Sequence, residues 1–498
     1  MGKDQQPGCL DVLVVGAGFG GIATAIKLQE RGISNFQVFE KSAGIGGTWW
    51  HNTYPGAACD IASHLYSYSF EPNPYWSRKF SPQAEIQAYI EHCADKYQVR
   101  SHIQLNTGVD DVYFEPDSEL WRCRLSSGKT VLARHVVFCT GGLHTPAYPD
   151  IPGREDFQGP TMHSADWDHS VEFDNKRVAV IGSAASAIQL VPELAKTAAA
   201  VDIYQRTPNY VAPRGDREFS DREKARFARW PLWHRLYRQF IFLRGEWMLF
   251  PVVKRKSRSR WRDMVQAYIT QHIRSSIADV WTRKLMTPDY PLGCKRILIA
   301  DNFYPAINRD NVQVIPEGIG HIGKDRLTTR DGVDRPADII VYATGFDVEQ
   351  HMYATRIVGP NGIGLQQRWE KKPTAYRGAF VPGLPNLYLM SGPNTGVGTT
   401  SVIYIIEAQL NLILQAIAAA GDDQLIEVTE AATGVYNSKL HKALQKTVWA
   451  GDCRSWYKRE DGEIVTLYPH NARRFRREHS RLRRSDFQIR PRLRSAGE

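Results

Sequence analysis

The sequence predicts an α/β fold with two Rossmann-like domains and a helical cap that is inserted into the second of them. A buried strand, a glycine-rich turn and a helix follow one another at residues 11–32 and again at 177–195, and each such unit predicts one domain. A polar, tryptophan-rich stretch at 216–290 contains no such turn and predicts the cap. The length of 498 residues leaves room for all three parts, since domains have about 100–200 residues.

The net charge of +10 comes from two short segments and not from the whole chain. Residues 473–498 hold ten Arg against three acidic residues, and residues 254–262 hold six cations and no acid. Because the remaining chain is nearly neutral, we expect no nucleic-acid partner. The most apolar helical stretch, 401–421, is interrupted by polar residues such as Glu407 and Gln409. We therefore expect no stable membrane insertion and a cytoplasmic protein. No pattern in the sequence indicates an oligomeric state.

The first strand–turn–helix unit predicts an FAD site. Gly16 permits the tight turn, Gly18 lets a pyrophosphate approach the backbone, and Gly21 lets the helix pack closely on the strand. The next strand ends in Glu40, whose carboxylate can accept hydrogen bonds from a ribose hydroxyl. The strand, the helix and the terminal acid together make this unit more specific than the three glycines alone.

The second unit predicts an NADPH site. Its phosphate-binding turn consists of Gly182, Ser183, Ala184, Ala185 and Ser186. The strand that follows ends at Arg206 and Thr207, where the first unit has an acid. Since a free 2′-hydroxyl favours an acid and a 2′-phosphate needs a cation, Arg206 indicates NADPH in preference to NADH. A solvated arginine at a strand end is the structural alternative.

Two strand-like runs that end in glycine, at 136–142 and 339–346, indicate where the chain leaves the FAD domain and returns to it. The NADPH domain is then an insertion. The predicted parts are an FAD-binding domain at 1–145 and 343–472, an NADPH-binding domain at 146–215 and 291–342, the helical cap at 216–290, and a basic C-terminal tail at 473–498.

The cap contains six aromatic residues spaced for one amphipathic helical face, namely Trp230, Trp233, Tyr237, Phe240, Trp247 and Phe250. The segment is interpreted as a cap that walls or gates a substrate pocket. A purely structural helical pair and a shallow contact with a membrane surface remain as alternatives.

A twelve-residue segment between the two units carries the most specific pattern in the chain. Phe157, Gly159, His163, Trp167 and Asp168 fill the pattern F-x-G-x-x-x-H-x-x-x-W-[P or D] at every specified position. This is the fingerprint of type I Baeyer–Villiger monooxygenases, which are class B flavoprotein monooxygenases, and the chain resembles that family. A second block at 46–60, with Gly47, Thr48, Trp49 and Asp60, is similar to another element of the same family.

The resemblance implies a reaction and a set of residues that perform it. In this family NADPH reduces FAD, the reduced flavin reacts with O2 to give a peroxyflavin, and a ketone is converted to an ester or a lactone. The resemblance implies that Arg296, in the segment Gly293-Cys294-Lys295-Arg296, stabilises the negative charge that develops on the former carbonyl oxygen of the substrate. It assigns Asp60 to orienting Arg296.

The resemblance also implies contacts with the two cofactors. Lys295 would bind the 2′-phosphate of NADPH together with Arg206, and Tyr66 and the backbone of Val109 would contact the flavin. His163 and Trp167 would couple the domains, with a packed structural histidine as the alternative role of His163. Gly47, Thr48 and Trp49 complete the predicted cofactor-binding set.

Two other classes of flavoenzyme compete with this interpretation. A flavin monooxygenase that acts on sulfur or nitrogen nucleophiles uses the same cofactors, and it stays as the alternative. A flavin disulfide reductase needs a redox pair of cysteines, and the seven cysteines of this chain include no Cys-x-x-Cys pair and no metal-ligand spacing. The block at 453–457 resembles a further family element, but Tyr468-Pro469-His470 departs from the family pattern after it.

Overall fold

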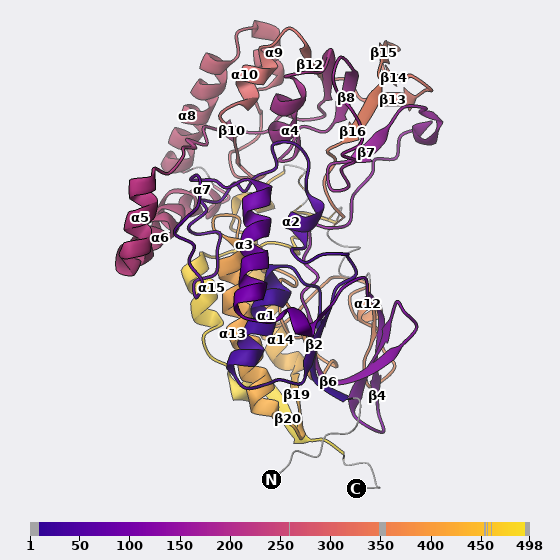
Figure 1. Ribbon diagram of the computed structural model, residues 1–498, viewed down its shortest axis with the longest axis vertical. Coiled ribbons are helices and arrows are strands. Elements are labelled where there is room, and N and C mark those ends of the chain that lie inside the picture. Colours follow the sequence, from indigo (N-terminus) through magenta and orange to yellow (C-terminus); the bar gives the residue numbers. More distant parts are fainter. Residues whose placement is uncertain are drawn as a thin grey trace.

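The computed structural model describes residues 9–257, 259–347, 355–452, 455, 457–459 and 461–493. Cys453, Arg454 and Trp456 of the block at 453–457, and residues 494–498 of the expected tail, lie outside the described residues. The two α/β domains are stacked along the long axis, and a group of helices projects from their side (Figure 1).

The first domain is built on a sheet with the order β17–β4–β5–β6–β1–β2–β3, and β18 also pairs with β6. Strand β1 lies between β2 and β6 and is parallel to both, and its residues Val12 to Val15 are all apolar and buried. The strands are β1 (Cys9–Val15), β2 (Phe36–Phe39), β3 (Ile103–Gln104), β4 (Val109–Glu115), β5 (Leu120–Leu125), β6 (Thr130–Phe138), β17 (Arg356–Val358) and β18 (Leu387–Leu389).

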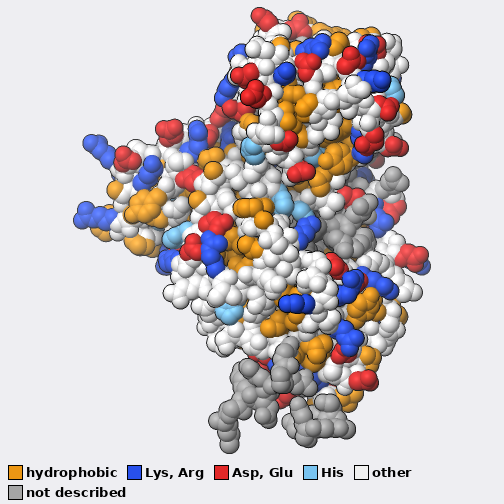
Figure 2. Space-filling model, turned by 45° about the vertical axis from the view of Figure 1, so that its right-hand side comes forward, with side chains coloured by type: hydrophobic (Ala, Val, Ile, Leu, Met, Phe, Trp, Pro, Cys, Tyr) orange, Lys and Arg blue, Asp and Glu red, His pale blue; other side chains and the backbone are white. Residues whose placement is uncertain are grey.

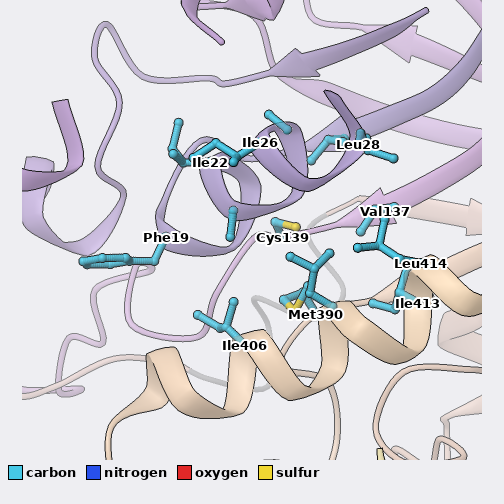
Figure 3. Packing of buried hydrophobic residues seen from close by; sticks show 14 of the residues in the cluster. Phe19, Ile22, Ile26, Leu28, Val137, Cys139, Met390, Ile406, Ile413 and Leu414 are labelled. Carbon is cyan, nitrogen blue, oxygen red and sulfur yellow. The ribbon is translucent and has the colours of Figure 1, made fainter. Parts of the chain in front are cut away.

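Helices cover this sheet and form the main core of the protein. Helix α1 lies beside α13, with Cys139, Met390 and Ile406 between them (Figure 3). Helix α13 is long and apolar enough to cross a membrane, but most of it is buried inside the domain. The helices are α1 (Phe19–Glu30), α2 (Thr48–His51), α3 (Gln83–Lys96), α12 (Leu365–Arg368), α13 (Val402–Ala420), α14 (Glu430–Leu444) and α15 (Ala472–Glu478).

The second domain contains a parallel sheet with the order β12–β9–β8–β16–β7. Its strands are β7 (Thr161–His163), β8 (Arg177–Ile181), β9 (Ala200–Tyr204), β12 (Val312–Ile315) and β16 (Ile339–Tyr342), with helices α4 (Ala187–Leu194) and α10 (Phe303–Ile307). Smaller sheets are formed by β10 (Val211–Ala212) with β11 (Leu298–Ile299), and by β13 (Ile319–Ile322), β14 (Arg326–Thr329) and β15 (Asp334–Pro336). The two predicted Rossmann-like units are therefore confirmed.

The helical cap consists of α5 (Asp221–Arg229), α6 (Pro231–Met248), α7 (Phe250–Val253), α8 (Arg260–Ser276) and α9 (Val280–Leu285). Four of the six aromatic residues whose spacing predicted one amphipathic face are exposed, namely Trp230, Trp233, Phe240 and Trp247. The inner face of α6 is formed by other residues, including His234, Phe242 and Glu246. Aromatic spacing predicted the helix correctly, but it did not show which face packs on the protein.

The Arg-rich segment that was expected to be a basic tail is part of the first domain. Helix α15 packs against α13, and Phe475 is fully buried. Strand β20 (Phe487–Pro491) pairs with β19 (Gln424–Val428) in an antiparallel ladder. Arginines alternate there with buried residues, because the segment presents one face to the core and one to solvent.

The two passages of the chain between the domains lie side by side. Ala147 donates from its backbone N–H to the carbonyl of Gly345 at 3.0 Å, and Asp347 donates to the carbonyl of Thr145 at 2.9 Å. Pro146 and Phe346 form an antiparallel bridge in the same place. The second domain is therefore joined to the first by a two-stranded connection.

Candidate functional site

The turn after β1 has the geometry that a bound pyrophosphate requires. Gly16 has φ +96°, and a Cβ at Gly21 would lie 1.8 Å from the carbonyl oxygen of Gly16, so the helix crosses the strand where only glycine fits. Helix α1 begins after Gly18 with no capping side chain and no acidic residue in its first turn. Its N-terminal N–H groups and the positive end of its dipole remain available to an anion.

Glu40 lies against this turn at the end of β2. Its two carboxylate oxygens accept hydrogen bonds from the backbone N–H groups of Ala17 at 2.7 Å and Ser42 at 2.9 Å. The carboxylate is buried and held beside the position that a ribose takes in this type of fold. Together with the glycine turn, it fits the adenosine part of FAD.

The block at 46–60 contacts the same turn. A Cβ at Gly47 would lie 3.2 Å from the Cα of Gly18, and Thr48 begins α2 directly after it. Trp49 is buried and donates from Nε1 to the hydroxyl of Tyr66 at 3.0 Å. The two backbones are thus so close that a methyl group added at Gly47 would crowd the backbone of Gly18.

Tyr66 and Val109 occupy different parts of the first domain. Burial raises the pKa of the Tyr66 hydroxyl, which lies within electrostatic reach of Cys59, Asp60 and Arg296. Val109 begins β4, and its carbonyl accepts a hydrogen bond from Thr355 at 3.0 Å. Thr107, two residues earlier, donates from its backbone N–H to the carbonyl of Glu40 at 2.8 Å. Tyr66 is therefore close to the predicted catalytic pair, whereas Val109 lies on the Glu40 side.

Arg296 and Asp60 form an ion pair that joins the two halves of the site. The Nη2 atom of Arg296 donates to Oδ2 of Asp60 at 2.5 Å. The Asp60 carboxylate raises the pKa of Arg296 and outweighs the opposite effect of burial. The Arg296 side chain is 41% exposed, so it can be reached from solvent although it is paired with Asp60. The Asp60 carboxylate, which comes from the block at 46–60, thus fixes the position of the Arg296 cation.

Two further residues lie next to this pair. Tyr457 is buried, and burial raises its pKa to about 12, with Arg296 and Asp60 as its charged neighbours. Cys294, two residues before Arg296, is disulfide-bonded. The spacing of the cysteines did not predict this crosslink, because only the fold decides which cysteines meet.

The loop that carries Asp60 is held by second-domain residues that the sequence did not single out. Gln189 of α4 accepts from the Tyr54 hydroxyl at 2.8 Å and donates to the carbonyl of Ala58 at 2.9 Å. Arg214 donates to the carbonyl of Cys59 at 2.9 Å. A cavity of about 600 Å³ behind this loop is lined by residues of both domains. No local pattern could reveal these contacts, since each joins residues more than a hundred positions apart.

The second turn resembles the first and leads to a cluster of cations. Gly182 has φ +110°, and its Cβ would lie 2.4 Å from the carbonyl oxygen of Ala343. Helix α4 begins after Ser186 with no capping side chain, and Ala184 and Ala185 are exposed in front of it, after Ser183. The turn therefore fits a nucleotide phosphate.

Arg206, Thr207 and Lys295 meet beside this turn. Lys295 donates from Nζ to the hydroxyl of Thr207 at 2.7 Å and lies over the ring of Tyr290. Burial lowers the pKa of Lys295, and the positive charge of Arg206 lowers it further. An anion between the two cations would relieve this repulsion, so the cluster fits a 2′-phosphate.

The fingerprint segment lies at the connection between the domains. His163 ends β7, is fully buried, and accepts from the backbone N–H of Ala165 at 3.1 Å. Burial lowers its pKa to about 4, so it is neutral at pH 7. Its ring contacts those of Tyr148 and Phe346, which belong to the two passages between the domains. This placement supports a packing role, because a neutral imidazole does not act as an acid at pH 7.

The other fingerprint residues also make packing contacts. A Cβ at Gly159 would lie 2.3 Å from the carbonyl oxygen of Asp338 and 2.7 Å from the ring of Phe157. Trp167 stacks on Phe173 with ring centroids 5.3 Å apart. Asp168 accepts from the backbone N–H and hydroxyl of Ser170 and so fixes the turn after Trp167.

Known proteins resemble this chain over most of its length. Residues 13–220 match the family described as pyridine nucleotide-disulphide oxidoreductase. A Baeyer–Villiger monooxygenase of Pseudomonas aeruginosa is 41% identical, over 93% of this chain and 88% of that protein. Another from Streptomyces coelicolor is 38% identical, over 96% of this chain and 92% of that protein.

Solved structures agree with these sequence relatives. An oxidised steroid monooxygenase bound to NADP superimposes with a TM-score of 0.87 and 29% identity, covering 97% of this chain and 99% of that chain. Cyclohexanone monooxygenase from Rhodococcus sp. Phi1 bound to NADP+ superimposes with a TM-score of 0.86 and 27% identity, with the same coverage of both chains.

Proposed function

Because the chain belongs to the Baeyer–Villiger monooxygenases, we propose that it inserts one oxygen atom of O2 beside the carbonyl of a small-molecule ketone, with Arg296 and Asp60 as its catalytic pair. The product is an ester or a lactone. FAD, reduced by NADPH, supplies the activated oxygen atom when it is bound. The observation that carries the proposal is the Arg296–Asp60 ion pair, which both domains assemble beside the FAD-type turn.

Arg296 stabilises the negative charge that the former carbonyl oxygen acquires when oxygen is added. Its charge is permanent, since Asp60 raises a pKa that is already high. A guanidinium fixed before the reaction begins does not reorganise as charge develops, which makes it worth several kcal/mol in a site that excludes water. Asp60 holds the guanidinium of Arg296 in place, and the N–H groups of Arg296 that do not bind Asp60 can donate to the substrate oxygen.

Binding of NADPH depends on the residues around the second turn. The turn at Gly182 receives the pyrophosphate, and Arg206, Thr207 and Lys295 receive the 2′-phosphate. Because Arg296 directly follows Lys295, phosphate binding and the catalytic cation are connected through one short segment. The proposal includes a cytoplasmic location and is supported there by the burial of α13, the membrane-length helix.

A competition assay tests the reaction itself. The purified FAD-loaded protein receives NADPH, air and equal amounts of cyclohexanone and methyl phenyl sulfide, and the products are separated and identified by mass spectrometry. We expect lactone, with NADPH consumption that rises when ketone is added. Sulfoxide without lactone would instead assign the enzyme to sulfur oxygenation. Hydrogen peroxide is measured in parallel, because it reports NADPH oxidation that is not coupled to product.

A further inference from the structure

Helix α6 carries an apolar face that points away from the protein. The outer stripe consists of Leu232, Trp233, Leu236, Phe240 and Trp247, whose exposed fractions are 69, 46, 55, 60 and 66%. At the helical angle of about 100° per residue, these five side chains fall within an arc of roughly 100°. Scattered exposed apolar residues are normal, but five on one stripe of one helix form a continuous surface.

The opposite face of α6 fixes the helix in this orientation. His234 contacts His64 at 2.7 Å, and Arg238 donates to the carbonyls of His64 and Ser67. Glu246 accepts from the backbone N–H of Ala472 at 3.0 Å. The helix is thus bound to the first domain through polar contacts, and it cannot rotate to bury the outer stripe without breaking them.

The outer stripe continues onto α8. Trp261 donates from Nε1 to the carbonyl of Met248 at the end of α6, at 2.9 Å. Met264 and Tyr268 follow it at helical spacing and are mostly exposed. The apolar surface therefore spans two helices of the cap.

Cations surround this surface. Residues 221–285 contain sixteen Lys and Arg against five Asp and Glu, so the cap alone carries a charge of +11 while the whole chain carries +10. Five arginines of α5 and α6 are exposed and have no acidic partner within the described part of the chain, namely Arg222, Arg226, Arg229, Arg235 and Arg244. Figure 2 shows hydrophobic and basic side chains together on the lobe that projects from the left of the molecule.

We propose that the outer stripe docks on an anionic lipid bilayer, with the aromatic and aliphatic side chains at the headgroup level and the arginines against lipid phosphates. A helix that is apolar on one face and basic at its edges lies in a membrane interface, where Trp and Arg are both favourable. The inner face of α6 carries His, Arg and Glu, so the helix lies on the membrane and does not cross it. The proposal is independent of the reaction assigned above.

The charge and the aliphatic side chains of the cap favour an anionic lipid bilayer over a second copy of the chain or a nucleic acid. A second copy of the chain would place one strongly positive cap against another, which like-charge repulsion opposes. A nucleic acid would match the charge and could stack on the aromatic rings, but it would leave the exposed aliphatic side chains of Leu232, Leu236 and Met248 without an apolar partner. Anionic lipid satisfies the charge and the aliphatic surface together.

Vesicle sedimentation of the full-length, FAD-loaded protein tests the docking. We expect binding to phosphatidylcholine vesicles that contain phosphatidylglycerol, weaker binding at high salt, and little binding to phosphatidylcholine alone. The variant Leu236→Gln/Phe240→Gln/Trp247→Gln should lower the partition coefficient at least about tenfold. Arg235→Glu/Arg244→Glu should remove the preference for anionic vesicles. The matched control, Val435→Gln/Val333→Gln, changes exposed apolar residues elsewhere and should bind like the unmutated protein.

Flavin absorbance and ketone-independent NADPH oxidation establish that each variant is folded, because these exposed residues do not touch the predicted site. The proposal is overturned if the triple variant binds anionic vesicles as the unmutated protein does, or if neutral vesicles bind equally well. It is also overturned if vesicles do not bind while sedimentation velocity shows a dimer that the triple variant abolishes, which would assign the outer stripe to a second copy. Binding of an oligonucleotide without binding of vesicles would assign it to nucleic acid.

Discussion

Arg296 is expected to act through the geometry of its guanidinium as well as through its charge. In Arg296→Lys the charge remains, but the fork that pairs with Asp60 is lost. We therefore expect the rate of ester formation to fall by about 10²–10³, while NADPH is still oxidised and hydrogen peroxide accumulates. Product and peroxide are measured together by chromatography and a peroxidase assay.

The control for this variant is Arg330→Lys, at an exposed position directly after β14. It should retain coupled ester formation. If Arg296→Lys made ester at nearly the unmutated rate, the assigned role of Arg296 would be wrong.

Arg206 and Lys295 are expected to determine the choice between NADPH and NADH. Arg206→Ala removes one of the two cations that the predicted 2′-phosphate site contains, and it also relieves the repulsion that lowers the pKa of Lys295. We expect KM for NADPH to rise by about tenfold or more and KM for NADH to change little. Steady-state kinetics with both coenzymes gives the ratio, and equal changes in the two KM values would contradict the assignment.

Some residues of the site could be predicted from a local motif, and others could not. Gly16, Gly21 and Glu40 belong to one short unit, and their positions follow from local geometry. Gln189 and Arg214, which hold the Asp60 loop, were not predicted because their partners come from another domain. The functional roles of Arg296 and Asp60 stay predictions that came from the family resemblance, and the variants above test them.

Among the elements, α15 shows how a charged segment can be structural. Phe475 is fully buried on it and stacks on His479, whose Nδ1 and Nε2 lie 2.7 and 2.9 Å from the carbonyl oxygens of Phe475 and Arg377. We expect Phe475→Ala to lower the free energy of unfolding by about 3–5 kcal/mol. Thermal unfolding followed by flavin fluorescence measures the loss.

A matched variant on the same helix distinguishes the effect of burial from the effect of charge. Arg477→Gln changes an exposed arginine on the same helix and should unfold like the original protein. A midpoint in Phe475→Ala as high as that of Arg477→Gln would show that α15 contributes little to stability. Deletion of residues 473–498 should prevent stable folding, because it removes both α15 and the strand that pairs with β19.

Helix α6 marks the limit of what periodicity predicts. The spacing of its aromatic residues identified an apolar stripe, yet the packed face contains His234, Arg238 and Glu246. Either face of such a helix can pack on the protein, and the spacing of its residues does not show which one does. The neighbouring elements decide this. The elements were therefore easier to predict than their orientation.

For the molecule as a whole, buried neutral histidines predict how stability depends on pH. Burial lowers the pKa of His135 to about 3 and the pKa values of His163 and His479 to about 4. The unfolded chain has histidines with a pKa of about 6.5 and binds more protons below that pH. Their contribution to stability is complete above about pH 6.5 and is lost as the pH falls toward about 4.

We expect each of these histidines to lower the free energy of unfolding by a few kcal/mol over this pH range, on the order of 1.4 kcal/mol per unit of pKa shift. Chemical denaturation at several pH values measures it. His135→Gln should give a shallower dependence, because a glutamine does not titrate. The same slope in the variant and in the unmutated protein would contradict the role of His135.

The paired passages at 145–148 and 343–347 have a consequence for engineering. The chain enters and leaves the second domain at neighbouring, hydrogen-bonded positions. The first domain therefore requires only that the two ends of the inserted segment lie side by side at that place. Domain insertions are tolerated where the two ends lie close together. The segment can therefore be treated as a cassette: a donor domain with adjacent termini can replace residues 149–342, once Arg296, the anchoring contacts of α6 and the contacts of the Asp60 loop are rebuilt. Coenzyme preference then becomes a property that can be transplanted as a unit.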